Sequence, residues 1–341
     1  MATSARVFLH RAMRASAPLI AVLIAALAAA AIQASSASAQ SWPTRPVTLV
    51  VPFVPGGATD VLGRIYADRL GAVLGQPVII DNKPGAGGNV GASFVAKSAP
   101  DGHTMFVASS PGFTNAAVLS KDAGFDPLKD FVAVALLGTQ GFLFALNAAA
   151  MPPNTVAEFV AFAKANPGKL NYGTPGIGTP HHLGMELFKS MAGIDVVHVP
   201  YRGGAPLMQD MLAGQVGIMF ASWVITGPHL KTGKFKAIAS TSKRPVTQAP
   251  EIPSIASQGY PDFDVETWFG LVAPAATPAT VLQRMSREIQ ALQASDEVRQ
   301  RMLTMGFDQP PADTVLQFGE RLARDAAKWS KIVKDVGIKP E

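Results

Sequence analysis

A short loop in the first quarter of the sequence has the composition of an anion-binding site. Pro55–Asp60 follows a β-rich run and precedes a stretch of helical periodicity. Gly56 and Gly57 leave the backbone amides unshielded, and a helix start adds a positive partial charge. Such a turn suits a carboxylate or a phosphate. It lacks the Gly-Lys-Ser/Thr ending of a P-loop, which disfavours a nucleoside triphosphate. An ordinary turn with Thr59 or Asp60 as helix cap is the alternative.

A second loop, Thr174–Thr179, repeats this pattern. It leaves a predicted strand, contains Gly176 and Gly178, offers a hydroxyl group at each end and enters a predicted helix. In open α/β sheets, ligands bind outside the carboxyl ends of the strands. Two such loops, one from each half of the chain, could face each other across a cleft. A dicarboxylate held between two helix starts would need no arginine.

A histidine and a tyrosine near these loops are further candidates. His182 begins the helix after the second loop and stands four residues before Glu186, which is the spacing of a metal-binding pair. No third ligand lies nearby in the sequence, so a hydrogen bond from His182 to the loop or to a ligand is favoured. Tyr201 follows a strand and is a candidate for the cleft. Arg202, beside it, is either a favourable charge for anions or plain surface.

Motifs of enzymes and of dinucleotide-binding proteins are missing from the sequence. Residues 81–91 have some features of a dinucleotide loop, but Val90 occupies the third glycine position. A structural turn or a pocket wall is expected there. The sequence has no Gly-x-Ser-x-Gly elbow and no His-Glu-x-x-His motif. Because it contains no Cys, it has no disulfide, no Cys-zinc site and no thiol nucleophile. An enzyme is therefore disfavoured.

The N-terminus has the layout of a secretory signal peptide. Three arginines form a basic segment, an apolar run follows over Ala17–Ile32, and Ala37–Ala39 matches the cleavage pattern. The apolar run is short for a bilayer span, which needs about 20 residues, so cleavage is favoured over a retained anchor. We expect residues 1–39 to be removed and the mature protein to lie in the periplasm.

Loss of that segment also removes most of the positive charge. Residues 1–39 carry three Arg and no acidic residue, so the formal net charge falls from +5 to +2. A nearly neutral protein with scattered basic residues has little affinity for nucleic acid. No later apolar run reaches bilayer length, so the mature chain is expected to be soluble.

Strand and helix signals alternate after Trp42, which predicts open α/β sheets. Val47–Val51 is a predicted strand, and apolar residues then recur at helical spacing until Gly75. The alternation continues after a break near residues 148–154, so two lobes are expected. The last part of the chain is predicted to be helical, with Thr277 as the first cap and Pro278 as the first helical residue.

Five ordered motifs resemble the Bug-type proteins, which are periplasmic solute receptors of tripartite tricarboxylate transporters. The resemblance covers essentially all of the mature chain. The motifs lie within Trp42–Asp60, Asp81–Gly88, Asn171–Leu183, Val199–Gly203 and Thr267–Pro274.

The resemblance implies an α/β, two-lobe periplasmic-binding-protein fold of type II, with the ligand cleft between the lobes and two chain crossings. Lobe 1 would comprise residues 43–145 plus 259–341, and lobe 2 residues 146–258. Backbone amides and ordered waters at the first loop would hold the ligand carboxylate. Hydroxyl and amide groups of the second loop would hold the other end. No cofactor, metal or catalytic residue is implied.

The resemblance and the loop chemistry together give one predicted binding set. Its members come from the two loops and from the ends of neighbouring strands: Phe53, Gly56, Gly57, Ala58, Thr59, Asp60, Ser109, Ser110, Thr174, Gly178, Thr179, His182, Tyr201, Gly203, Ala221 and Ser222.

The chain departs from the family pattern at the expected pocket wall. Many relatives have an acidic residue where Ala221 stands, and Trp223 follows two residues later. The run Ser110–Phe113 also differs from the commoner small polar run. Loss of a carboxylate, with gain of Phe113 and Trp223, would suit a less cationic and more apolar ligand. An aromatic or aliphatic dicarboxylate is therefore expected, rather than aspartate.

The predicted function is that of a monomeric solute-binding protein. It would capture a small carboxylate and deliver it to the membrane components of a tripartite tricarboxylate transporter. Two alternatives stay open at this point: a ligand receptor for a sensor kinase, and a periplasmic hydrolase that uses His182 as its base.

Overall fold

The computed structural model describes residues 42–110, 112–114, 116, 123–201, 204–311, 313–335 and 337. The chain divides into two units, Met1–Thr44 and Arg45–Glu341, and the α/β fold belongs to the second. The predicted export signal at 1–39 and the predicted site residue Gly203 lie outside the described residues. Within the described part, no helix is both long enough and apolar enough to span a bilayer.

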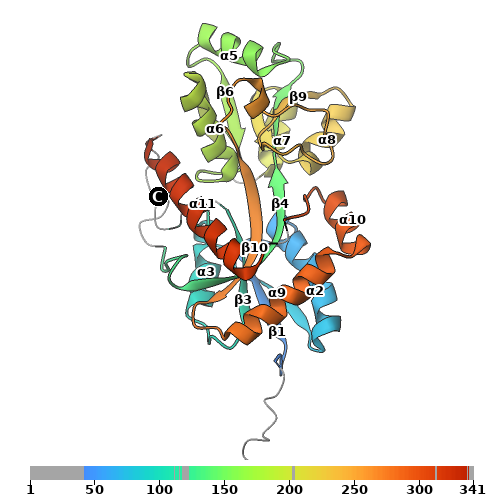
Figure 1. Cartoon of the computed structure of the whole chain (residues 1–341). Helices are drawn as coiled ribbons and strands as arrows, with labels where there is room; N and C mark the ends of the chain where they lie inside the picture. The colour runs from blue at the N-terminus through green and yellow to red at the C-terminus, as the bar shows by residue number, and fades with distance from the viewer. Residues whose placement is uncertain are drawn as a thin grey trace, which may run out of the picture. The chain divides into compact units, whose positions relative to one another are not determined.

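The first sheet has the strand order β2-β1-β3-β10-β4. Figure 1 shows β10 beside β4 in this sheet. β1 pairs in parallel with β2 and β3, whereas β10 lies antiparallel between β3 and β4. A strand from late in the chain therefore completes a sheet begun by the earliest ones. The strands are Val47–Val51 (β1), Val78–Asn82 (β2), Thr104–Ser109 (β3), Phe131–Gly141 (β4) and Glu266–Pro274 (β10).

The second sheet has the order β7-β6-β8-β5-β9. β6 is parallel to β7 and β8, and β5 is antiparallel to β8 and β9. The parallel strands bring their carboxyl ends, where the second glycine loop begins, to one edge of the sheet. The strands are Leu143–Asn147 (β5), Asn171–Thr174 (β6), Val197–Pro200 (β7), Ile218–Ala221 (β8) and Phe235–Ser240 (β9).

Helices follow most of the strands, as the alternating pattern predicts. In α2, Leu62, Ile65 and Tyr66 recur at helical spacing and are buried. Gly75 then ends the helix in the left-handed conformation at φ 71°. The helices are Ala58–Leu74 (α2), Asn89–Ala96 (α3), Val156–Ala165 (α5), Pro180–Ala192 (α6), Gly204–Ala213 (α7), Trp223–Lys231 (α8), Ala279–Gln293 (α9), Asp296–Thr304 (α10) and Val315–Asp335 (α11), with short 3₁₀ turns at Ala86–Gly88 and Ala256–Gln258.

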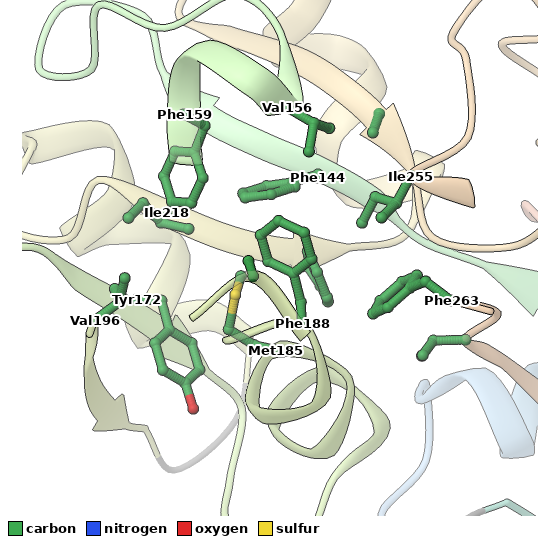
Figure 2. Packing of buried hydrophobic residues seen from close by; sticks show 14 of the residues in the cluster. Phe144, Val156, Phe159, Tyr172, Met185, Phe188, Val196, Ile218, Ile255 and Phe263 are labelled. Atoms are coloured by element: carbon green, nitrogen blue, oxygen red, sulfur yellow. The ribbon is translucent and has the colours of Figure 1, made fainter. Parts of the chain in front are cut away.

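The core of the second sheet combines aliphatic side chains with a group of aromatic ones (Figure 2). The ring centroid of Phe144 lies 4.8 Å from that of Phe159 and 5.5 Å from that of Phe188, and both pairs are edge-on. Such pairs add about 0.5–1.5 kcal/mol each beyond area burial. Phe159 comes from α5 and Phe188 from α6, so these contacts fix both helices on the sheet. The loop that precedes α6 is fixed with them.

Helix α11 contributes side chains to two cores. Phe318 and Leu322 belong to the buried cluster of the first sheet, together with Phe106. Further along the helix, Trp329 belongs to the cluster that contains Phe144 in the second sheet. The helix therefore packs against both sheets and ties them together by apolar burial.

Two passages of the described chain link the sheets, one from β4 to β5 and the other from β9 to β10. Thr241, which is 1% exposed, joins them. Its hydroxyl accepts a hydrogen bond from the Phe142 N–H at 3.0 Å and donates one to the Val265 carbonyl at 2.7 Å. Main-chain bonds from Thr241 to Phe142 and from Val265 to Thr241, both 2.9 Å, run beside it. The two passages thus form one hydrogen-bonded band.

The predicted fold class is confirmed, because the protein has two open α/β sheets with helices packed on them. The division into lobes at 145/146 and 258/259 stays a proposal. The predicted start of the helix at Pro278 was wrong by one residue, since Pro278 is the cap and the helix begins at Ala279. The Thr277 hydroxyl donates to the Pro274 carbonyl instead of capping the helix.

Candidate functional site

The helix start after β1 leaves its first amides open. Gly57 is the N-cap of α2, and no side chain caps the helix. The first amides of a helix have no partner within it, and α2 begins at Ala58. Gly56 has φ +88°, a conformation that favours glycine. The predicted cap at Thr59 or Asp60 was wrong, because both residues lie inside the helix and are buried.

Asp60 holds this loop in shape. Its carboxylate is 2% exposed and accepts hydrogen bonds from the Gly56 N–H, the Arg64 Nε and the Asn82 Nδ2, each at 2.9 Å. Burial alone would raise the pKa of Asp60, but the bonds from Arg64, Gly56 and Asn82 outweigh burial and hold the pKa below its usual range. With its carboxylate oxygens engaged inside the protein, Asp60 organises the turn. The Gly56 amide is taken up by this bond, so the open donors are those further along, at the start of α2.

Asn82 is a second organiser, which the predicted binding set did not include. Its amide donates to the Phe53 carbonyl and to Asp60, both at 2.9 Å. Phe53 is 39% exposed and lies two residues after the end of β1. The run from Asp81 that resembles a family motif was the available signal for this residue. It thus connects the end of β2 to the first glycine loop.

The second loop is closed by its own hydroxyl groups. Thr179 caps α6, accepting from the His182 N–H at 3.4 Å while donating to the Gly176 carbonyl at 2.7 Å. Thr174, which is fully buried, donates to the same carbonyl at 3.1 Å. Four of the predicted residues, Thr174, Gly178, Thr179 and His182, are brought together here.

His182 accepts a hydrogen bond from the Gly178 N–H at its Nδ1, at 3.1 Å. An imidazole that accepts at Nδ1 carries its proton on Nε2 when it is neutral. Neither ring nitrogen is then a free proton acceptor, which argues against the hydrolase interpretation. Burial lowers the pKa of His182, with the nearby charges of Glu186 and Lys189 acting in opposite directions. The neutral ring is therefore the favoured form.

The metal-pair interpretation has no support in the structure. The Glu186 carboxylate accepts hydrogen bonds from the Tyr172 hydroxyl and from the Lys189 ammonium. Across the described part of the chain, no group of three or more His, Cys, Asp or Glu side chains could hold a metal ion.

Tyr201 lies beside the second loop, and α8 starts after the end of the next strand, β8. The Tyr201 N–H donates to the Thr174 carbonyl at 2.9 Å, and its hydroxyl donates to Asp210 at 2.7 Å. Burial and the Asp210 carboxylate raise the pKa of Tyr201 to about 12.

Ala221 ends β8 and is buried. Ser222 is the N-cap of α8, yet its side chain makes no capping bond, so this helix start is also open.

The two predicted serines after β3 differ in their roles. Ser109 ends the strand and is partly exposed. Ser110 is 2% exposed, and its hydroxyl accepts from the Trp268 N–H at 3.3 Å, which ties β3 to β10. Ser110 is thus held in the sheet rather than presented to a ligand. Phe113 is 6% exposed and stacks on Phe125, so it belongs to the first core.

A small cavity of about 20 Å³ connects this core to the predicted site. Phe53 and Ser109 line it together with Gly88, Phe106 and Phe113. Its volume corresponds to about one water molecule. The wall beside Ser109 is therefore aromatic, as the sequence suggested, although Phe113 contributes from within the core.

Residues 62–338 match the family model of the tripartite tricarboxylate transporter family receptor. The chain belongs to this receptor family. The resemblance drawn from the motifs is thereby confirmed. BugT of Bordetella pertussis is 32% identical to this receptor over 322 residues, which are 94% of this chain and 98% of BugT.

Solved structures show the same similarity. The R. palustris protein Rpa4515 with adipate is 33% identical to the receptor, with a TM-score of 0.78 over 88% of this chain and 100% of that one. MatC (Rpa3494) from Rhodopseudomonas palustris with bound malate is 32% identical, with a TM-score of 0.74 over 86% and 100%. The receptor thus shares its α/β fold with periplasmic solute-binding proteins, two of which were solved with carboxylates.

A larger cavity of the receptor, about 260 Å³, is lined by other residues. Arg244 and Arg299 line it with Glu266 and Asp308, and Arg244 pairs with Glu266 at 2.7 Å. The two positive and two negative side chains balance, and no residue of the predicted binding set lines this cavity. Although this cavity is larger, its balanced charges do not favour an anion, so it is a weaker candidate for a carboxylate site than the helix starts.

Proposed function

We propose that this receptor captures a small carboxylate between the Gly56–Asp60 loop and the Thr174–Thr179 loop. The observation that carries the proposal is the uncapped start of α2, whose turn Asp60 and Asn82 hold in one shape. Helix amides that are already in position bind an anion without the entropic cost of ordering the loop. The second loop, capped by Thr179, would hold the far end of the ligand.

The ligand we propose is a dicarboxylate with an apolar body. Ala221, which is buried in a cluster with Leu207 and Met211, has a methyl group at the position where an acidic side chain would attract an ammonium group. Large apolar side chains near the proposed contact loops are exposed, with Phe53 at 39%, Ile177 at 46% and Val224 at 47%. The adipate of Rpa4515 has this character, two carboxylates joined by a methylene chain. A ligand with extra hydroxyl or ammonium groups would bury them without partners, which is costly.

Capture would proceed by closure of two lobes, with boundaries at residues 145/146 and 258/259. The band at Thr241 supports this, because both chain passages meet at one hydrogen-bonded point about which the lobes could rotate. The mature protein would be a periplasmic monomer after removal of residues 1–39. It would pass its ligand to the membrane components of a tripartite tricarboxylate transporter.

Calorimetric titration with adipate, terephthalate, malate, citrate and aspartate tests the function and the ligand class together. Adipate and terephthalate are expected to bind at least about tenfold more tightly than aspartate or citrate, a difference of about 1.4 kcal/mol. Tight aspartate binding would refute the ligand class, and no binding by any carboxylate would refute the function. Loss of uptake of the bound compound on deletion of the gene would separate transport from service to a sensor kinase.

A further inference from the structure

Two histidines from different elements are stacked behind the second loop. His182 belongs to α6 and His198 to β7. Their ring centroids are 4.0 Å apart, with 16° between the planes. Tyr172 of β6 stacks on the other face of His198 at 4.9 Å and 23°. Parallel pairing places Tyr172 opposite His198 in the sheet, which explains why residues far apart in sequence form one column.

Each histidine of the stack holds one end of the loop. The His198 Nε2 lies 2.7 Å from the Thr174 hydroxyl, where the loop begins. The His182 Nδ1 accepts the Gly178 N–H near the point where the loop enters α6. The two rings therefore fix both ends of the segment that carries the hydroxyl and amide groups.

The geometry requires His182 to be neutral. Protonation of Nδ1 would remove the acceptor for Gly178. A charge on either ring would also lie among poorly solvated groups, and two charges would stand face to face. Burial, and then the neighbouring His182, lower the pKa of His198 to about 4, while burial lowers the pKa of His182. Both rings are thus neutral near pH 7, and acid would charge them.

Few other titratable groups act on the pair. Glu186 and Lys189, both on α6, form an ion pair at 2.7 Å. Glu186 raises the pKa of both rings, and Lys189 lowers it. From β6, the Tyr172 hydroxyl is bound to Glu186. β8, which also packs on α6, has no titratable residue. α11 packs on α6 as well and carries eight charged residues, none of which is among the charges that shift the pKa of either ring: Glu320, Arg321, Arg324, Asp325, Lys328, Lys331, Lys334 and Asp335.

We propose that His182 and His198 form a pH-sensitive clamp that holds the Thr174–Thr179 loop ready for a carboxylate and releases it in acid. His198 is a positioning residue in this clamp, because it contacts Thr174 of the loop and is not itself proposed to contact the ligand. The effect on ligand affinity rests on the proposed function; the effect on the loop does not.

A double variant without titratable rings tests the clamp. In His182→Asn/His198→Gln, the Asn oxygen can replace Nδ1 as acceptor for Gly178, and the Gln amide can replace Nε2 at Thr174. Terephthalate affinity is measured by calorimetry at pH 7.5, 6.0 and 4.5 for both proteins. Protonation of terephthalate itself is common to both and cancels in the ratio of their dissociation constants. Wild-type affinity is expected to fall more than that of the variant between pH 7.5 and 4.5. Protonation of a ring with a pKa of about 4 accounts for about 1.3-fold of this difference, and protonation of His182 adds to it.

His229→Gln, a change on α8, is the matched control and is expected to follow the wild type. Equal pH profiles for the wild type and the double variant would overturn the proposal. So would a wild-type affinity that rises in acid relative to the variant, since a charged ring would then attract the ligand instead of freeing the loop.

Nuclear magnetic resonance of the ligand-free wild type tests the clamp without any ligand. The amide of Gly178 is expected to shift along the same titration curve as the imidazole nitrogens of His182. A Gly178 amide that stays constant while that ring titrates would overturn the clamp. If the wild type binds no carboxylate at pH 7.5 yet the Gly178 amide follows the histidine, the proposed function fails and the clamp stands.

Discussion

Replacing Ala58 with proline is expected to weaken carboxylate binding by about ten- to a hundredfold while leaving the fold intact. Ala58 is the exposed first residue of α2. Proline is well tolerated at this helical position, and the preceding Gly57 has the extended conformation, φ −74° and ψ 166°, that a following proline requires. The substitution removes one N–H from the proposed anion site. A hydrogen bond to a charged group contributes about 1.5–3 kcal/mol, which sets the expected loss.

An alanine-to-proline change at the first residue of another helix separates loss of the anion-binding amide from a general effect of proline. Ala279 is the exposed first residue of α9, and the residue before it has ψ 138°. Ala279→Pro is therefore expected to bind like the wild type. Ala58→Val keeps the amide while adding bulk, and it should lose less affinity than Ala58→Pro. Calorimetry with the tightest ligand and thermal melting check all three; unchanged binding in Ala58→Pro would remove the α2 amides from the site.

Acid is expected to destabilise the ligand-free protein through His181. Its Nδ1 is buried without a hydrogen-bond partner, and its ring lies 4.5 Å from Phe142, which is in the band between the sheets. Burial lowers the pKa of His181 to about 4 from 6.5. Between these values the unfolded chain binds a proton that the folded protein does not, so stability falls as the pH falls from 6.5 to 4. The loss from this residue reaches about 3 kcal/mol.

His181→Phe removes that proton site and keeps an aromatic ring beside Phe142. Urea unfolding at pH 7, 6, 5 and 4.5 would measure the free energy of unfolding for both proteins. The wild type should lose more stability than the variant as the pH falls, and the difference should develop below pH 6.5. His198 is present in both proteins, so its own contribution cancels. Parallel curves would show that His181 is solvated or paired, contrary to the structure.

The local patterns of this sequence were sufficient for most of the strands and for the two glycine loops. The loop Thr174–Thr179 was predicted because a strand, two glycines and a helix start follow one another along the chain. The cap of α2 was predicted wrongly for an informative reason. Thr59 and Asp60 are good capping residues, but the chain places Gly57 at the cap and turns Asp60 inward. Glycine is itself an accepted N-cap residue, and the hydrogen bond that the Asp60 carboxylate accepts from the Gly56 N–H draws Asp60 away from the cap position.

Features that depend on contacts distant in sequence were not predictable. His198 carries no local signal, and only the pairing of β6 with β7 brings it to Thr174. The strand β10 enters between β3 and β4 from more than a hundred residues later in the chain, which no periodicity reveals. Helix α8 contains Gly227 and Pro228, which mask its helical pattern. Ser110 looked like a ligand contact, but its hydroxyl is used by Trp268.

A crystal structure with the tightest carboxylate of the panel tests the central claim most directly. We expect one carboxylate within hydrogen-bonding distance of the Ala58 and Thr59 amides, with the other end of the ligand on the Thr174–Thr179 loop. A ligand held instead by Arg244 and Arg299 in the larger cavity, with the start of α2 facing water, would contradict it.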